Sequence, residues 1–252
     1  LFPYTTLFRS PDTALAKEAG LELGIKGSIV VNDRMETSVP DIYAAGDAVQ
    51  VKHYVTGDDA LISLAGPANK QGRIIADNIC GGDSHYLGSQ GSSVIKVFDM
   101  TAATTGINET NAKKSGLEVD TVILSPMSHA GYYPGGKVMT MKVVFEKETY
   151  RLLGAQIIGY EGVDKRIDVL ATAIHAGLKA TQLKDLDLAY APPYSSAKDP
   201  VNMAGFMIDN IAKGTLKQWH LEDMDKISKD KNVVLLDVRT VGEFNRGHMK
   251  GF

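Results

Sequence analysis

Residues 37–47, TSVPDIYAAGD, constrain the fold of this chain more than any other segment. The apolar stretch 42–45 lies between Pro40 and Gly46, which is the pattern of a short buried strand in a parallel sheet. Open α/β sheets bind ligands at the carboxyl ends of such strands. Gly46 would let a ligand approach the backbone closely, and the Asp47 carboxylate would accept hydrogen bonds from sugar or polyol hydroxyls. Alternatively, Asp47 caps a following helix, and spacing alone does not separate the two interpretations.

The rest of the chain alternates between helical and strand periodicity. We predict helices over 12–19, 62–79, 108–115, 163–176 and 200–211, and another shortly after Trp219. Strands are predicted over 28–31, 94–98, 119–124, 138–145, 152–160 and 233–239, with a hairpin turn at 146–150. The buried face of the helix 62–79 is expected to carry Leu64, Ala68, Ile75 and Ile79. The Gly- and Ser-rich stretch 81–93 is the expected internal boundary.

The composition argues against several classes of function. The 252 residues include 27 basic and 30 acidic side chains, a net charge of −3, which gives no nucleic-acid footprint. No apolar run reaches the roughly 20 residues that span a bilayer, and no signal peptide is visible. The 6 His are too scattered to predict a metal cluster. We therefore expect a soluble, cytoplasmic protein with no nucleic-acid, membrane or metal partner.

Cys80 is the single cysteine of the sequence. One cysteine cannot form an internal disulfide or a redox-active dithiol pair, which fits a reducing compartment. It stands at an expected helix end beside Gly81, with no neighbouring base, so we expect a half-buried and unreactive thiol.

Both ends of the sequence look cut. Residues 1–10, LFPYTTLFRS, follow neither period and resemble translated adapter sequence, so we expect them to be non-native. The other end, residues 247–252, comes just after an expected strand and the start of a helix. The chain is therefore interpreted as a fragment of a longer protein.

The segment 37–47 and the helix after it resemble the second flavin-binding fingerprint of the FAD-dependent pyridine nucleotide-disulfide oxidoreductases. This family includes glutathione reductase, NADH oxidase and coenzyme A-disulfide reductase. The resemblance implies that the Asp47 carboxylate holds a ribityl hydroxyl of FAD and that the following helix directs its N-terminus at the pyrimidine end of the isoalloxazine. A helix N-terminus stabilises the negative charge of reduced flavin. The residues that the resemblance assigns to the cofactor are Thr37, Gly46, Asp47, Leu64, Ala65, Gly66 and Tyr190.

The same resemblance implies a fold class of α/β and α+β parts. Residues 11–27 would end an NAD(P)-binding domain, 28–90 would be the C-terminal part of a doubly wound FAD-binding domain, and 91–215 would be an α+β dimerisation domain. A homodimer using FAD and NAD(P)H is then expected. No Gly-x-Gly-x-x-Gly follows a strand here, so the phosphate-binding turns and the redox-active Cys of the family are expected upstream.

Residues 190–202, YAPPYSSAKDPVN, narrow the choice within the family. Dithiol members carry a His backed by a Glu in this region, and the absence of any His favours the single-Cys branch. Within that branch the stretch resembles coenzyme A-disulfide reductases and NADH-dependent persulfide reductases. There the Tyr matching Tyr190 lies against the flavin and the Lys matching Lys198 contacts coenzyme A. The alternative is that these side chains only pack a loop.

A second segment with the same resemblance is 128–135, SHAGYYPG. Its family Tyr, either Tyr132 or Tyr133 here, reaches the active Cys of the partner subunit. A phenol there can donate a proton or a hydrogen bond to a thiolate leaving group. Asn69 matches a position where such reductases often carry a His that contacts coenzyme A, so this sequence departs from the family there.

Residues 233–248 resemble the start of a rhodanese domain. The pattern is VVLLDVR followed by Glu243, Phe244, Gly247 and His248. In rhodaneses a Cys thiolate on a later loop carries sulfane sulfur. A generic buried strand and helix is the alternative. We therefore expect residues 216–252 to be the truncated start of an α/β rhodanese domain.

Together these resemblances imply a reductase. In full-length form it would pass hydride from NAD(P)H through FAD to a single Cys, absent here, that reduces coenzyme A disulfide or coenzyme A persulfide. One alternative is an NADH oxidase or peroxidase of the same superfamily. The other is a non-catalytic association module, because the isolated residues are expected to be inactive.

Overall fold

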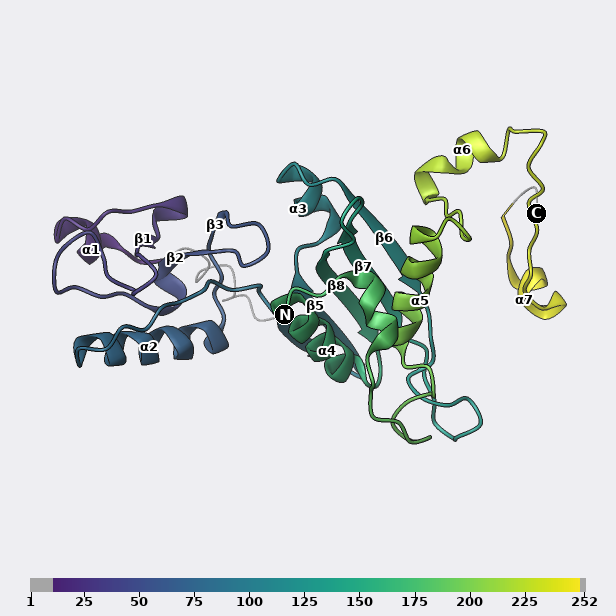
Figure 1. Cartoon of the computed structure of the whole chain (residues 1–252), viewed down its shortest axis with the longest axis horizontal. Coiled ribbons are helices and arrows are strands. Elements are labelled where there is room, and N and C mark those ends of the chain that lie inside the picture. Colours follow the sequence, from purple (N-terminus) through teal and green to yellow (C-terminus); the bar gives the residue numbers. More distant parts are fainter. Residues whose placement is uncertain (1–10, 250–252) are drawn as a thin grey trace. The chain divides into compact units, whose positions relative to one another are not determined.

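The computed structural model describes residues 11–249, and Figure 1 shows the order of the elements. The chain divides into two compact units, the first ending at Asp209 and the second beginning at Asn210. The predictions for residues 1–10, and for residues 250–252, lie outside the described residues. No helix within 11–249 combines the length and the apolar character needed to cross a bilayer.

The first unit begins with a helix and a small mixed sheet. Helix α1 (Ala14–Glu18) confirms the helix predicted over 12–19. The strands are β1 (Ile29–Val30), β2 (Val49–Lys52) and β3 (Asp59–Ala60), in the order β1-β2-β3. β1 pairs with β2 in parallel and β2 with β3 antiparallel.

Helix α2 (Ala65–Ile79) confirms the helix predicted over 62–79, but its inward face differs from the prediction. Gln71 and Asn78 are buried, whereas Ile79 is 64% exposed. The two amides lie inward because both hold neighbouring loops by hydrogen bonds. The apolar core beside them consists of Met35, Val49 and Val51, with Ile29, Val31, Ala44, Ile62, Ile74, Ile75 and Tyr86 packed around it.

Residues 42–45 do not form the predicted strand. Tyr43 makes only an isolated antiparallel bridge with Glu36. The chain turns just before this segment, where Asp41 has a φ of 63°, and the segment therefore folds back on the residues that precede it. Ala44 packs against the core, which accounts for the apolar pattern without strand pairing.

The larger sheet of the first unit has five antiparallel strands in the order β4-β5-β8-β7-β6. They are β4 (Ser93–Val97), β5 (Met100–Gly106), β6 (Val119–Leu124), β7 (Thr140–Glu146) and β8 (Leu152–Gly159). Four of the predicted strands and the β7–β8 hairpin are confirmed. β5 was not predicted, because its sequence MTAATTG lacks the larger β-branched and aromatic side chains that mark strands.

Three helices follow or interrupt this sheet as predicted: α3 (Glu109–Lys114), α4 (Val163–His175) and α5 (Pro200–Ala212). The side chain of Asn108 caps α3 by accepting the N–H of Asn111 at 2.9 Å. α4 packs on β5 and β8 through its buried stripe, which includes Val163, Ile167 and Leu170. The loop between β6 and β7 carries Tyr132 and Tyr133, and the loop that precedes α5 carries Tyr190.

The second unit contains short helices: a 3-10 turn (Leu221–Asp223), α6 (Met224–Ile227) and α7 (Val241–Arg246). The strand predicted over 233–239 is absent, and Val234 and Val238 are each 87% exposed. No neighbouring strand in the described part of this unit supplies the hydrogen bonds that a strand requires. Helix α7 is capped by Thr240, whose hydroxyl accepts the N–H of Glu243.

Candidate functional site

Within the segment 37–47, the turn at Gly46–Ala48, here called the fingerprint turn, precedes a strand instead of following one. Residues Gly46–Ala48 form a 3-10 turn that leads into β2, which corrects the prediction that Asp47 ends a strand. Gly46 has a φ of 82°, a conformation that glycine adopts without the penalty of a Cβ. Its N–H donates to Oε1 of Gln71 on α2 at 2.7 Å. The Asp47 side chain is exposed and has no hydrogen-bond partner within the described residues, so its carboxylate is free to accept.

The N-terminus of α2 is open. Leu64 is the N-cap in an extended conformation, and no side chain caps the first turn. Ala65 and Gly66 are exposed, and a Cβ added at Gly66 would meet no atom within 4 Å. The N–H groups of a first turn carry the positive end of the helix dipole. The hydrogen bond to Gln71 thus holds the fingerprint turn next to this helix.

Two other predicted residues make local contacts instead. The Thr37 hydroxyl accepts the N–H of Val39 at 3.3 Å and so closes a turn within the fingerprint. The Asn69 amide nitrogen donates to the carbonyl of Ala65 at 2.9 Å, within its own helix. Its amide oxygen has no hydrogen-bond partner among the described residues.

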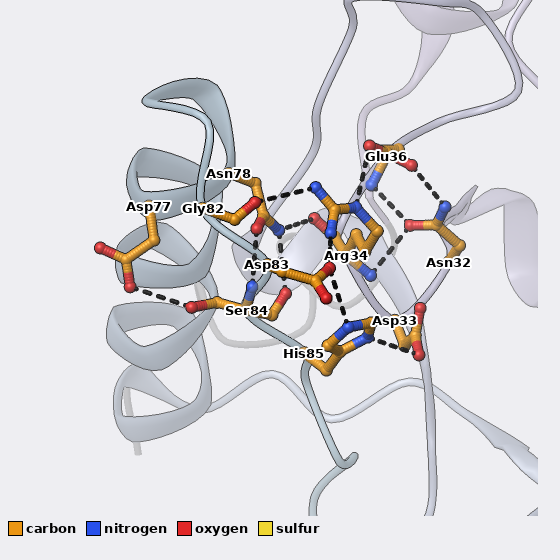
Figure 2. A network of polar contacts seen from close by, with 10 residues as sticks. All are labelled: Asn32, Asp33, Arg34, Glu36, Asp77, Asn78, Gly82, Asp83, Ser84 and His85. Atoms are coloured by element: carbon orange, nitrogen blue, oxygen red, sulfur yellow. Dashed lines mark hydrogen bonds and ion pairs between the residues drawn. The ribbon is translucent and has the colours of Figure 1, made fainter.

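A polar network that was not predicted holds the far end of α2, and Figure 2 shows its members. The Asn78 amide nitrogen donates to the carbonyls of Arg34 and Ser84, and its oxygen accepts the N–H of Ser84 at 2.8 Å. The Arg34 guanidinium forms an ion pair with Asp83 and donates to the Gly82 carbonyl at 3.2 Å. The network therefore ties the loop after β1 to the loop after α2.

His85 closes this network between two carboxylates (Figure 2). Its Nδ1 lies 2.9 Å from Oδ2 of Asp33, and its Nε2 lies 3.2 Å from Oδ1 of Asp83. The hydrogen bond with Asp33, with the charges of both carboxylates, raises the pKa of His85 above its ordinary value. When it is protonated, His85 can donate to both carboxylates and so bridge the two loops.

The structure joins two tyrosines that were predicted for separate roles. The hydroxyl oxygens of Tyr132 and Tyr190 are 2.8 Å apart, and both side chains are exposed. This hydrogen bond raises the pKa of Tyr190. Tyr133 instead packs edge-on against the ring of the buried His129, with ring centres 5.6 Å apart. Of the two candidates in this loop, Tyr132 is therefore the one that meets Tyr190.

A buried ion pair next to the two tyrosine loops, which carry Tyr132 and Tyr190, was also not predicted. Arg166 on α4 is 1% exposed, and its Nη2 lies 2.9 Å from Oδ2 of Asp199. Burial would raise the pKa of Asp199, but the N–H of Val201, Arg166 and the Ser195 hydroxyl together hold it below its usual range. The carboxylate stays charged and begins α5 by accepting the Val201 N–H at 3.0 Å. Lys198, beside Asp199, is exposed.

The structure corrects one expectation, which concerns Cys80. Cys80 is exposed at the C-cap of α2, which corrects the expectation of a half-buried thiol. Within residues 11–249, no three side chains of His, Cys, Asp or Glu are grouped to hold a metal ion.

Two segments of the chain match known sequence families. Residues 8–72 match the pyridine nucleotide-disulphide oxidoreductases, and residues 92–200 match their dimerisation domain. The chain belongs to the pyridine nucleotide-disulphide oxidoreductases. Its described part accordingly combines a portion of the FAD domain of this family with the dimerisation domain, in a mixed α/β fold.

Known proteins that are similar to this chain include a coenzyme A disulfide reductase and a persulfide reductase. The coenzyme A disulfide reductase of Staphylococcus epidermidis is 36% identical over 197 residues, covering 78% of this chain and 44% of that protein. The structure of reduced Bacillus anthracis CoADR-RHD is 48% identical with a TM-score of 0.91, covering 96% of this chain and 43% of that one. The NAD-dependent persulfide reductase from A. fulgidus is 41% identical with a TM-score of 0.87, over the same shares. The chain thus spans less than half the length of each.

Proposed function

We propose that this chain is part of an FAD-dependent NAD(P)H oxidoreductase that reduces coenzyme A disulfide or coenzyme A persulfide. The observation that carries the proposal is the hydrogen-bonded pair of exposed phenols, Tyr132 and Tyr190. The similarity to a coenzyme A disulfide reductase and a persulfide reductase supports this substrate class. In this proposal, the redox-active Cys lies in the same full-length protein, outside the 252 residues.

The fingerprint turn and the first turn of α2 fit FAD. Asp47 would accept a hydrogen bond from a ribityl hydroxyl, since its exposed carboxylate has no partner among the described residues. The N–H groups of Ala65 and Gly66 would face the pyrimidine end of the isoalloxazine, because no side chain caps them. When bound, FAD supplies two-electron transfer from NAD(P)H to a sulfur centre. Leu64, Gly46 and Thr37 would keep the backbone of this site in place.

The tyrosine pair would act on the leaving sulfur. Breaking an S–S bond releases a thiolate, which leaves more readily when a nearby group donates a proton or a hydrogen bond to it. One hydroxyl of the pair donates to the other, so the accepting phenol keeps its own proton for an outside acceptor. Lys198 would pair with a phosphate of coenzyme A. The amide oxygen of Asn69 would be the atom that contacts the same ligand.

The dimerisation-domain match supports a homodimer in which each tyrosine pair completes the site of the partner subunit. We also propose that residues 216–252 begin a rhodanese domain, on the strength of the sequence pattern around Asp237 and Glu243. Sequencing the encoding DNA beyond Phe252 tests the second proposal. A downstream Cys loop supports it, and an early stop codon contradicts it.

The test of the reductase uses the full-length protein carrying Tyr132→Phe or Tyr190→Phe. We expect turnover with coenzyme A disulfide or persulfide to fall by about a hundredfold, while reduction of the flavin by NADH keeps its rate. Tyr160→Phe is the matched control, because Tyr160 is an exposed tyrosine of the same domain outside the pair. It should leave turnover unchanged.

Two other outcomes separate the alternatives. Steady NADH-dependent oxygen consumption without any sulfur acceptor, insensitive to both substitutions, would identify an oxidase instead. NADH-dependent turnover by the isolated 252 residues would contradict the need for a Cys outside them. Weakened FAD retention in Asp47→Ala, with retention unchanged in Asp58→Ala, tests the cofactor site separately, because Asp58 is an exposed carboxylate outside the fingerprint segment.

A further inference from the structure

The two tyrosine loops are held by one buried cation. Arg166 lies on the inward face of α4, where the rest of the stripe is apolar. Its Nη2 donates to the carbonyl of Ser128 at 2.9 Å and to the carbonyl of Tyr194 at 3.3 Å. Ser128 belongs to the loop that carries Tyr132, and Tyr194 belongs to the loop that carries Tyr190. A single guanidinium therefore contacts the backbone of both loops.

A carboxylate completes this contact. Asp199 accepts from Nε of Arg166 at 3.2 Å and from the Ser195 hydroxyl at 2.7 Å. Ser195 Oγ also lies 3.2 Å from Nη2 of Arg166. Because Asp199 also begins α5, the loop of Tyr190 is fixed at its end as well as at its middle.

The loops also touch each other directly. The N–H of Ala130 donates to the carbonyl of Ser195 at 3.0 Å. On α4, Lys165 donates to the carbonyl of Ala189, next to Tyr190, at 3.3 Å. These contacts hold the backbones of the two loops close together. The positions of the two exposed phenols are therefore set by the loop backbones and not by burial of their rings.

The geometry requires arginine at this position. Its guanidinium presents donors in a fixed plane, and here they reach a carboxylate, a hydroxyl and two loop carbonyls at once. Lysine offers a single strongly hydrated ammonium that cannot span these acceptors. The guanidinium also packs directly against Gly162. Any side chain at Gly162 would clash with it, because an added Cβ would lie 2.0 Å from Nη1 of Arg166.

We propose that Arg166, through its pair with Asp199, is the positioning residue of the Tyr132–Tyr190 pair, and that it sets the geometry in which the phenols meet the reacting sulfur. This inference rests on the proposed function only for its effect on turnover. The positioning itself is a property of the fold and is tested without substrate.

The first measurement is hydrogen exchange of the full-length protein, comparing wild type with Arg166→Lys. We expect faster exchange in residues 126–137 and 187–199, with β7 and β8 unchanged. Asp209→Asn is the control, because it breaks the Lys184–Asp209 ion pair of the same domain, and both residues lie outside the two loop ranges. Wild-type exchange in both loops of Arg166→Lys would overturn the inference.

The second measurement is a double-mutant cycle on turnover. Arg166→Lys should lower kcat about tenfold or more, because small displacements of catalytic groups are costly. In a Tyr132→Phe background the same change should cost little, since the pair is already broken. Losses that multiply independently would show a general structural role and overturn the proposal. Asp209→Asn should behave identically in both backgrounds.

A second variant keeps the test decisive if Arg166→Lys does not fold. Ser195→Ala removes only one hydroxyl and leaves the Arg166–Asp199 pair. It should raise exchange in the same loops and be non-additive with Tyr132→Phe, and wild-type behaviour in both assays would overturn the inference. If Tyr132→Phe itself leaves turnover unchanged, the proposed function fails, while the exchange result still decides the positioning.

Discussion

The hydroxyl oxygens of Tyr132 and Tyr190 lie 2.8 Å apart, although 58 residues separate the two in the sequence. The hydrogen bond joins the β6–β7 loop to the loop before α5. Within the pair, one hydroxyl donates to the other, and the accepting hydroxyl keeps its own proton for an outside acceptor. Hydrogen bonds in a chain polarise one another, so the accepting hydroxyl is a better donor than an isolated phenol.

The first prediction concerns this pair. Tyr132→Phe should lower the pKa of Tyr190 toward the ordinary tyrosine value, because the hydrogen bond with Tyr132 is what raises it. Titration of 13Cζ-labelled tyrosines by NMR measures the change. Tyr133→Phe is the control, since Tyr133 contacts His129 and not the pair. A Tyr190 resonance that titrates alike in wild type and Tyr132→Phe would contradict the hydrogen bond.

The second prediction concerns the buried ion pair. Asp199→Asn should lower the free energy of unfolding by about 3–5 kcal/mol, because it leaves the Arg166 cation buried without its counter-charge. Denaturant unfolding followed by far-UV circular dichroism measures the loss. Asp209→Asn should cost less, since water reaches its ion pair more readily. Equal losses in the two variants would argue against a special role for the buried pair.

The third prediction concerns pH and His85. The folded-state pKa of His85 is raised above 6.5, so its protonated form stabilises the fold. That contribution is complete below pH 6.5 and is lost as the pH rises through the raised pKa. Thermal unfolding between pH 5 and pH 9 should therefore show a loss in wild type that is absent from His85→Gln. Parallel profiles would exclude the bridge to Asp33.

The fourth prediction concerns acid stability and Glu109. Lys113 and Lys142 lower the pKa of Glu109 from 4.5 to about 2. A lowered carboxylate pKa contributes stability above pH 4.5, and this is lost as the pH falls toward about 2. Glu109→Gln should remove that part of the acid-induced destabilisation. The control is Glu148→Gln, in the turn between β7 and β8. It should leave the acid profile unchanged.

Local sequence patterns predicted the elements whose hydrogen bonds are made within the same short stretch of chain. The helices at α2, α4 and α5 follow from apolar periodicity, and the β7–β8 hairpin follows from two alternating runs around a turn. The segments 42–45 and 233–239 were both predicted to be strands from their apolar residues, yet neither forms a strand. A strand requires a neighbouring strand that supplies its hydrogen bonds, and the sequence of one segment does not predict whether such a neighbour is present.

The candidate site divides in the same way. Resemblance supplied Asp47, Tyr132 and Tyr190, but it did not show that the two tyrosines meet. The buried Arg166 carried a detectable signal, because it falls on the apolar stripe of α4 between Val163 and Leu170. A charge on such a stripe requires a counter-charge. Which acid supplies it depends on tertiary packing, which periodicity does not describe.

The set of hydrogen bonds that Arg166 donates has a consequence for chimeric proteins. Its acceptors come from the β6–β7 loop, the turn before α4, the loop of Tyr194 and Ser195, and the start of α5. Neither tyrosine loop can be exchanged with that of a relative by itself, since the transplanted backbone must present its carbonyls to the same guanidinium. We therefore expect that a graft preserving the phenol pair has to carry both loops and α4 together.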